Sequence, residues 1–174
     1  MFSKKRLFVP AALILTAFFG VSAANAQDPS CPYSLASLQG SYAVLVNYGA
    51  SVAIGLQPEF LDGKGNLTRT GVLNQPTAGS TTGARTVATV SSKGTYTVNC
   101  NGSGTITRIV TRPDGSTASA IDDFIITAAS NKFFWLPAIA TTIVDAQRDP
   151  SVILPGGVFV TRVHTRLSDY IPNN

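Results

Sequence analysis

Histidine and cysteine are scarce in this chain of 174 residues, which contains one histidine and two cysteines. A structural zinc site takes roughly four such ligands, usually supplied as closely spaced pairs. Cys31 and Cys100 lie far apart in the sequence, and His164 is distant from both. We therefore expect no metal site, and no motif indicates an organic cofactor.

Long apolar runs and clusters of basic residues are also missing from most of the chain. Beyond residue 21 no stretch approaches the roughly 18 apolar residues of a membrane-spanning helix. Of the 13 lysines and arginines, three stand together at positions 4–6, and the others are scattered among the 9 acidic residues. A nucleic-acid-binding protein would concentrate its basic residues on one face or segment. These absences predict that the chain has neither a transmembrane anchor nor a nucleic-acid partner.

The N-terminus does contain the pattern of an export signal. The basic residues at 4–6 precede an apolar run over 7–21, and Ala24 and Ala26 supply the small residues of a signal-peptidase site. The sequence predicts a signal peptide at 1–26 and a single β-barrel domain at 27–174, exported to the periplasm or the medium. A domain of about 150 residues is long enough to bury a hydrophobic core of its own.

Both cysteines follow the predicted signal peptide. In an oxidising compartment, two cysteines in a small exported domain most simply pair, so we expect a disulfide between Cys31 and Cys100. In the chain-entropy account, a bridge that closes about 70 residues stabilises the fold by roughly 4 kcal/mol. Two unpaired buried thiols are the alternative.

The mature chain is patterned for β-strands almost throughout. A short helical turn at 34–38, which Gly40 is placed to end, precedes a segment at 42–48 that alternates between two faces. The segment at 62–66 has the composition of a tight hairpin loop. Strands are expected at 42–48, up to 61, and at 67–73, 85–91, 94–100, 104–112, 121–128, 132–136 and 157–166, and the segment at 138–144 is a candidate for one more. Short turns join most of them, which predicts an all-β fold: one closed antiparallel barrel of about eight strands.

Two parts of this pattern resemble the calycin families, which include the lipocalins. Gly40 and Tyr42 open the first strand after a helical turn, and Arg162 lies in the last strand. In calycins a Gly-x-Trp stands at the first place, and a late arginine packs across the ring to close the barrel; here Tyr42 replaces the tryptophan. The stretches at 38–42, 60–67 and 94–102 are similar to exported bacterial proteins with lipocalin-like or allene-oxide-cyclase-like barrels. The resemblance implies a calycin-like fold, contact between Tyr42 and Arg162, and structural roles for Gly40, Tyr42 and Arg162.

Two groups of ionisable residues are candidates for chemistry. Asp122 and Asp123 are adjacent carboxylates, but neighbours on a strand point to opposite faces and cannot converge on one substrate. His164 shares a strand face with Arg162 and Arg166, which could place a general base beside an anion-binding pair. A solvated polar face is the more ordinary interpretation of that pattern. No Gly-x-Ser-x-Gly element supports a serine hydrolase, and no catalytic residue is assigned.

Other motifs are better explained by structure. The segment at 62–66 is similar to a calcium loop in composition, but Lys64 occupies a ligand position and the bidentate glutamate is missing, so a turn is expected. Phe133, Phe134 and Trp135 form the densest aromatic group of the chain. If these residues lie on a strand, we expect their side chains to fill the core of the domain rather than to line a ligand cavity.

Three alternative functions remain open. The first is a non-enzymatic exported barrel that binds a small apolar ligand or acts at the cell envelope. The second is a barrel enzyme of the cyclase or isomerase type, and the third is a structural or interaction protein with a filled core. An outer-membrane barrel is disfavoured, because Arg108, Asp123 and Arg162 interrupt the apolar rows that lipid contact requires. Free space inside the barrel would favour the first two alternatives over the third.

Overall fold

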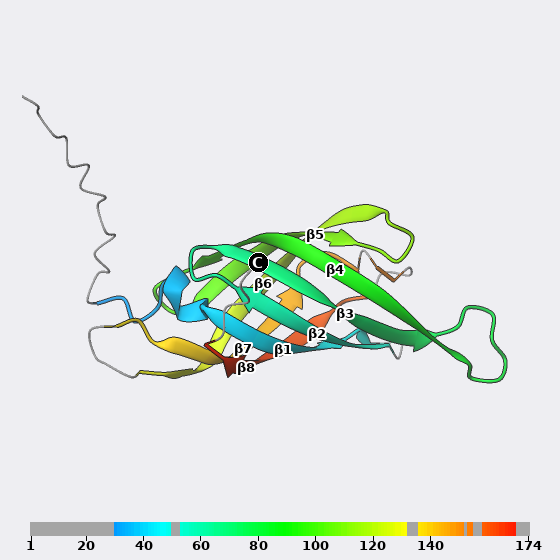
Figure 1. Ribbon diagram of the computed structural model, residues 1–174, viewed down its shortest axis with the longest axis horizontal. Helices are drawn as coiled ribbons and strands as arrows, with labels where there is room; N and C mark the ends of the chain where they lie inside the picture. Colours follow the sequence, from blue (N-terminus) through cyan, green and yellow to red (C-terminus); the bar gives the residue numbers. More distant parts are fainter. Residues whose placement is uncertain (1–29, 50–52, 132–135, 152, 155–157, 170–174) are drawn as a thin grey trace, which may run out of the picture.

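The computed structural model describes residues 30–49, 53–131, 136–151, 153–154 and 158–169, and the predicted signal peptide therefore lies outside the described residues. Eight antiparallel strands form one closed barrel, in which each strand pairs with the next and β8 returns to β1 (Figure 1). The prediction of an all-β, eight-stranded antiparallel barrel is confirmed. The elements are η1 (Leu35–Leu38), β1 (Gly40–Asn47), β2 (Ile54–Leu61), β3 (Asn66–Pro76), β4 (Arg85–Val98), β5 (Ser103–Thr111), β6 (Thr117–Ser130), β7 (Ile139–Gln147) and β8 (Thr161–Ser168).

Alternation along the strands decides which side chains enter the barrel. In β1, Tyr42, Val44 and Val46 are buried, whereas Leu45 and Asn47, each next to one of them in sequence, are exposed. Successive side chains on a strand point to opposite faces, so one face of each strand supplies the interior. The pattern at 42–48 thus becomes an inner and an outer row of the closed sheet.

Apolar clusters pack toward both ends of the barrel interior. One cluster gathers around Leu38 of η1, which is completely buried among Tyr42, Leu61 and Tyr96. The short helix therefore covers the end at which β1 begins. The other cluster joins Val46, Tyr48 and Leu73 to Leu154 and Val160, which precede β8.

The sequence placed a strand break between 91 and 94, and this prediction is wrong. Arg85–Val98 is one strand, and it pairs without interruption with β3 along its length from Pro76 to Asn66. Gly94 is not a turn residue here. A Cβ atom at Gly94 would lie 2.1 Å from the carbonyl oxygen of Thr107 on β5, so the glycine permits a close approach of two strands.

The later strands also differ in extent from the expectation. β6 continues to Ser130, and β8 begins at Thr161 rather than near 157. The strand expected at 132–136 lies almost entirely outside the described residues, as do Phe133, Phe134 and Trp135. The predicted hairpin loop at 62–66 is confirmed: the Asp62 carboxylate accepts hydrogen bonds from the backbone N–H groups of Lys64 and Asn66 at 2.7 and 2.9 Å.

The predicted pairing of the first and last strands is confirmed, but the arginine that contacts Tyr42 is not the one that was predicted. Tyr42 pairs with Arg166, whose guanidinium lies over the Tyr42 ring at 5.6 Å from its centroid. Arg162 pairs with Val46, four residues further along β1, so the predicted contact between Tyr42 and Arg162 is wrong. Gly40 belongs to the same corner, because a Cβ atom there would lie 2.7 Å from the Arg166 guanidinium. The structural role assigned to Gly40 stays a prediction.

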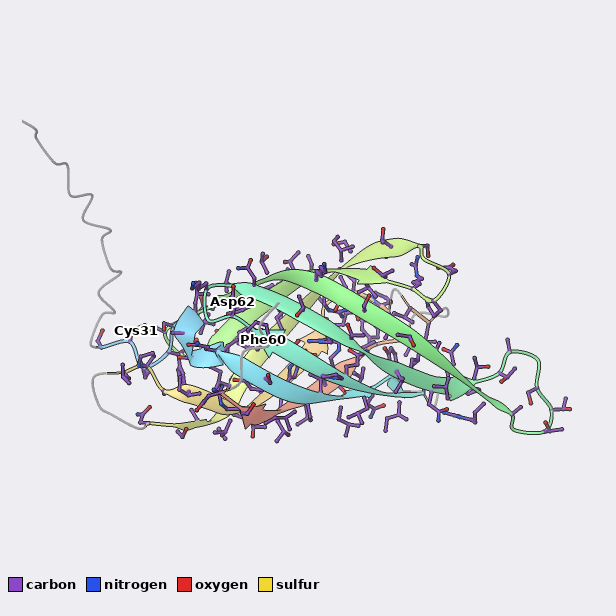
Figure 2. The ribbon with its side chains drawn as sticks, viewed as in Figure 1. Cys31, Phe60 and Asp62 are labelled. Carbon is purple, nitrogen blue, oxygen red and sulfur yellow. A yellow bond between two sulfur atoms is a disulfide. The ribbon has the colours of Figure 1, made fainter. Side chains whose placement is uncertain are left out.

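The predicted disulfide joins Cys31 to Cys100, with the two Cα atoms 4.8 Å apart. It ties the segment before η1 to the loop between β4 and β5. Figure 2 shows Cys31 at the same end of the barrel as Asp62 of the β2–β3 loop. Within the described part of the chain, no helix has the length and apolar character needed to cross a membrane.

Candidate functional site

Charged side chains fill the middle of the barrel. Seven of them are almost completely buried and come from six strands. His164 shows where they lie, since its strand neighbours are Val44 of one apolar cluster and Ile143 of the other. We call this set the central ion network; its members are Glu59, Arg69, Arg108, Asp122, Asp145, Arg162 and His164.

Arg162 connects the acidic residues of the network. Its Nη1 donates to Asp122 Oδ1 at 2.9 Å and to Asp145 Oδ1 at 2.8 Å. Its Nη2 donates to the Gln147 side-chain oxygen at 3.3 Å. Arg108 holds Asp122 from the other side, with its Nε 2.6 Å from Oδ2 and its Nη2 3.1 Å from Oδ1. Each carboxylate is therefore held by more than one donor.

His164 lies between two carboxylates. Its Nδ1 is 2.7 Å from Glu59 Oε1, and its Nε2 is 2.8 Å from Asp145 Oδ2. An ionised carboxylate only accepts hydrogen bonds, so both ring nitrogens must donate and the imidazole must carry two protons. Arg69 completes this side through hydrogen bonds from Nε, at 2.8 Å, and Nη2 to Glu59 Oε2.

The pKa values of these groups follow from the pairing. Burial raises the pKa of Glu59, but the charges of Arg69 and His164 outweigh it and bring the value down to about 2. Burial likewise opposes the charged forms of Asp145 and Asp122, and Arg162 is the main cause that lowers both pKa values. For His164, burial lowers the pKa, but Glu59 and Asp145 raise it to a net value above the ordinary one. The three carboxylates and His164 are therefore held in their charged forms.

This arrangement stabilises charge but does not expose a reactive group. His164 has no exposed surface, and both of its nitrogens are engaged by carboxylates, so it offers no lone pair to a substrate. The sequence interpretation of a solvated face for His164 and Arg162 is wrong, because both side chains point into the barrel. The expectation for Asp122 and Asp123 is confirmed: Asp122 is buried, whereas Asp123 lies outside and pairs with Arg148 at 2.6 Å.

Glu59, Arg69 and Asp145 were not singled out by the sequence analysis. Each stands at an inward position of its strand, in phase with buried apolar neighbours such as Leu61 beside Glu59. A charged residue in phase with the apolar face is the signal that could have identified them. Which charges meet could not be seen, because Glu59 and His164 are 105 residues apart.

The outer surface carries one row of aliphatic side chains in cross-strand register. The row crosses six strands and consists of Val72, Leu56, Leu45, Val163, Val144 and Ile125. Of the three charged residues counted against a lipid-facing surface, Arg108 and Arg162 point inward and only Asp123 lies outside. The neighbouring rows nevertheless contain Asn47 and Thr161, so the aliphatic row falls far short of an apolar band about 25 Å tall.

A groove of about 670 Å³ lies outside the barrel, beside η1 and the adjoining ends of β7 and β8. Two charged residues line it together with threonine side chains and five apolar side chains, namely Ala36, Leu136, Pro137, Ile139 and Leu167. The charged residues are Arg166, whose side chain is mostly buried, and the exposed Asp169. In Figure 1 this region lies at the end where η1 is drawn in blue and β8 finishes in red. We call it the η1 groove.

Arg166 is held at the edge of the η1 groove by three different partners. Its Nη1 donates to the backbone oxygen of Gln39 and to the Tyr42 hydroxyl, the latter at 3.1 Å. Its Nη2 donates to Asp169 Oδ1 at 2.6 Å. The same arginine therefore closes the barrel against Tyr42 and presents positive charge to the groove.

Because His164 is protonated in the folded protein, we expect the stability of the fold to depend on pH. The folded pKa lies above the ordinary value of 6.5, so the contribution of His164 to stability is complete below pH 6.5 and is lost as the pH rises through the raised value. The Glu59 pKa falls from 4.5 to about 2, so its contribution is present above pH 4.5 and is lost as the pH falls toward 2. The free energy of unfolding, measured by urea titration, should therefore be greatest between about pH 4.5 and 6.5.

Nitrogen NMR of the only histidine tests the same prediction without a variant. Because each ring nitrogen of His164 lies within hydrogen-bond distance of a carboxylate oxygen, both nitrogens should carry protons in the folded protein at pH 6. The variant His164→Gln should lose the decline in stability on the alkaline side. A neutral ring in the folded protein at pH 6 would contradict the charged clamp.

Comparisons of the chain with models of protein families, with curated proteins and with solved structures found no match.

Proposed function

We propose that the protein is an exported, calycin-like barrel that binds a small apolar or amphipathic ligand in the η1 groove without catalysing a reaction. The observation that carries the proposal is the groove itself, whose volume of about 670 Å³ lies in the range of small-molecule sites. Apolar side chains form part of its walls, and hydroxyl, amide and charged side chains form the rest. Such a site suits a ligand with an apolar body.

The groove is a better place for an apolar ligand than the middle of the barrel. Paired charges such as Arg162 and Asp145 occupy that middle, and an apolar ligand there would have to separate them in a medium without water. Removing one partner of a buried ion pair typically costs about 3–5 kcal/mol. The sequence-based idea of ligand binding thus moves from the interior to the outer groove.

The filled centre also supports a second candidate, a structural or interaction protein that uses only its outer surface. The central ion network joins six of the eight strands and would keep such a scaffold rigid. The two candidates differ in one measurable respect: only the first binds a small molecule at the η1 groove.

Export and calycin-like closure belong to the same proposal. The Cys31–Cys100 bridge suits an oxidising compartment, and the pattern at 1–26 is that of a cleaved signal. The contact between Arg166 and Tyr42 across β1 and β8 supports a calycin-like arrangement, with the arginine four positions later than the resemblance implied. The N-terminus of protein secreted by its own host should be residue 27.

A binding experiment with a matched control tests the site. N-phenyl-1-naphthylamine, an uncharged fluorophore, should bind the wild-type protein, and Leu167→Asp should weaken this binding by about tenfold, since an apolar contact of roughly 1.4 kcal/mol is lost. Leu56→Asp is the control, because Leu56 is similarly exposed, at 58% against 64% for Leu167, but lies outside the groove.

Two results would count against the proposal. An equal loss of fluorophore binding in Leu167→Asp and Leu56→Asp would place the site elsewhere. No binding to the wild type would favour the structural alternative. Native mass spectrometry of protein purified from its own host offers a second measurement, in which a retained small molecule supports ligand binding and names its chemical class.

A further inference from the structure

The two charged residues of the η1 groove differ sharply in how firmly they are held. The Arg166 side chain is only 12% exposed, and it is fixed by the Gln39 backbone, the Tyr42 hydroxyl and the Tyr42 ring. The Asp169 side chain is 72% exposed and follows the last residue of β8. The positive charge is therefore built into the barrel, whereas the negative charge is attached at its surface.

The ion pair between Arg166 and Asp169 is easily exchanged. The two side chains are 2.6 Å apart at their closest atoms, but the Asp169 carboxylate lies in water, which screens the attraction and limits what the pair contributes to stability. A carboxylate from a ligand can offer the guanidinium the same hydrogen bonds. Asp169 thus occupies the place that an anionic group of a bound molecule would take.

The apolar walls lie next to this place. Leu167 is adjacent to Arg166 in β8, and Ile139 begins β7 on the neighbouring strand; both line the groove together with Leu136 and Pro137. A molecule with an apolar chain along these walls would bring its end to Arg166. A neutral molecule could form no ion pair with Arg166. A cationic molecule would be repelled by the Arg166 guanidinium.

Building on the proposed function, we propose that the ligand of the η1 groove is an anionic amphiphile: an alkyl chain that ends in a carboxylate. The chain lies against Leu136, Ile139 and Leu167, and the carboxylate replaces Asp169 as the partner of the Arg166 guanidinium. Asp169 acts as an internal substitute that satisfies the arginine while the groove is empty and competes with the ligand for it.

Octanoate and 1-octanol, which share a chain and differ in the charged group, separate these contributions. Calorimetric titration of the wild type should show octanoate binding several-fold more tightly than 1-octanol. Asp169→Asn removes the competing carboxylate and should tighten octanoate about two- to fivefold, with 1-octanol unchanged. Arg166→Gln should abolish the preference for octanoate, and its binding of 1-octanol reports whether the groove still forms.

Asp123→Asn is the matched control. Asp123 is also an exposed aspartate paired with an arginine at 2.6 Å, but it lies on β6 and does not line the groove. This variant should leave both affinities unchanged. Octanol binding as tight as octanoate, or no gain for octanoate in Asp169→Asn, would overturn the inference while leaving groove binding intact. No binding of either compound would instead overturn the proposed function.

Discussion

Replacing Arg162 with methionine is expected to lower the free energy of unfolding by about 3–5 kcal/mol, because the change leaves buried carboxylates without their main partner. Arg162 donates to both Asp122 and Asp145, and neither carboxylate has exposed surface at its side chain. Methionine preserves much of the side-chain volume, so the decrease in the free energy of unfolding comes from the missing charge rather than from a cavity. Urea unfolding at pH 6, followed by circular dichroism, measures the difference.

Arg148→Met is the control for this experiment. Arg148 also pairs with an aspartate, Asp123, but both side chains are about half exposed. Exposed ion pairs are worth about 0–1 kcal/mol, so this variant should unfold close to the wild type. Equal destabilisation by the two substitutions would mean that the central ion network adds nothing beyond an ordinary surface pair. Failure of Arg162→Met to accumulate as folded protein, with Arg148→Met normal, would agree with the prediction.

Removal of the disulfide is expected to cost a similar amount, about 4 kcal/mol. The bridge between Cys31 and Cys100 spans a sequence separation of 69, and such a loop loses much conformational entropy in the unfolded chain when it is closed. The double variant Cys31→Ser, Cys100→Ser should therefore unfold at a clearly lower urea concentration than the oxidised wild type. The comparison should be made at one pH, because the ion network titrates.

Reduction provides the control for the serine substitutions. Dithiothreitol should lower the stability of the wild type to that of the double variant and leave the double variant unchanged. Peptide mapping without reductant should recover the two cysteines as one linked species. Free thiols at both positions in protein from the periplasm or medium would contradict the bridge, and an unchanged unfolding midpoint would show that it does not constrain the unfolded chain.

The strands and the disulfide were accessible from the sequence because their signals are local or few in number. Alternation in β1 shows directly which residues face inward, and two cysteines allow only one pairing. Gly94 shows the limit of local signals. A glycine inside a strand pattern has the same appearance whether it turns the chain or admits a neighbouring strand, and only the position of Thr107 on β5 distinguishes the two.

The candidate sites depended on contacts that no local pattern contains. The sequence placed Arg162 and His164 on one face of a strand, and the calycin resemblance assigned Arg162 to Tyr42. The register between β1 and β8 instead gives Tyr42 to Arg166. Register across the closing strands is set by the stagger of the whole barrel, which accumulates around all eight strands. A shift of four residues along one strand is therefore invisible until the barrel closes.

By itself, the sequence determined the all-β class, a closed antiparallel barrel of about eight strands and the single cysteine pair, since periodicity, turn composition and a count of two are properties of the chain. Only the tertiary structure decided that Glu59, His164 and Asp145 form a charged clamp and that Arg166 serves both the barrel and the η1 groove. The physical reason is that a buried charged side chain is stable only beside partners of opposite charge, and the closed barrel brings those partners together. Those partners come from strands far apart in the chain, and their identity follows from the geometry of the closed sheet.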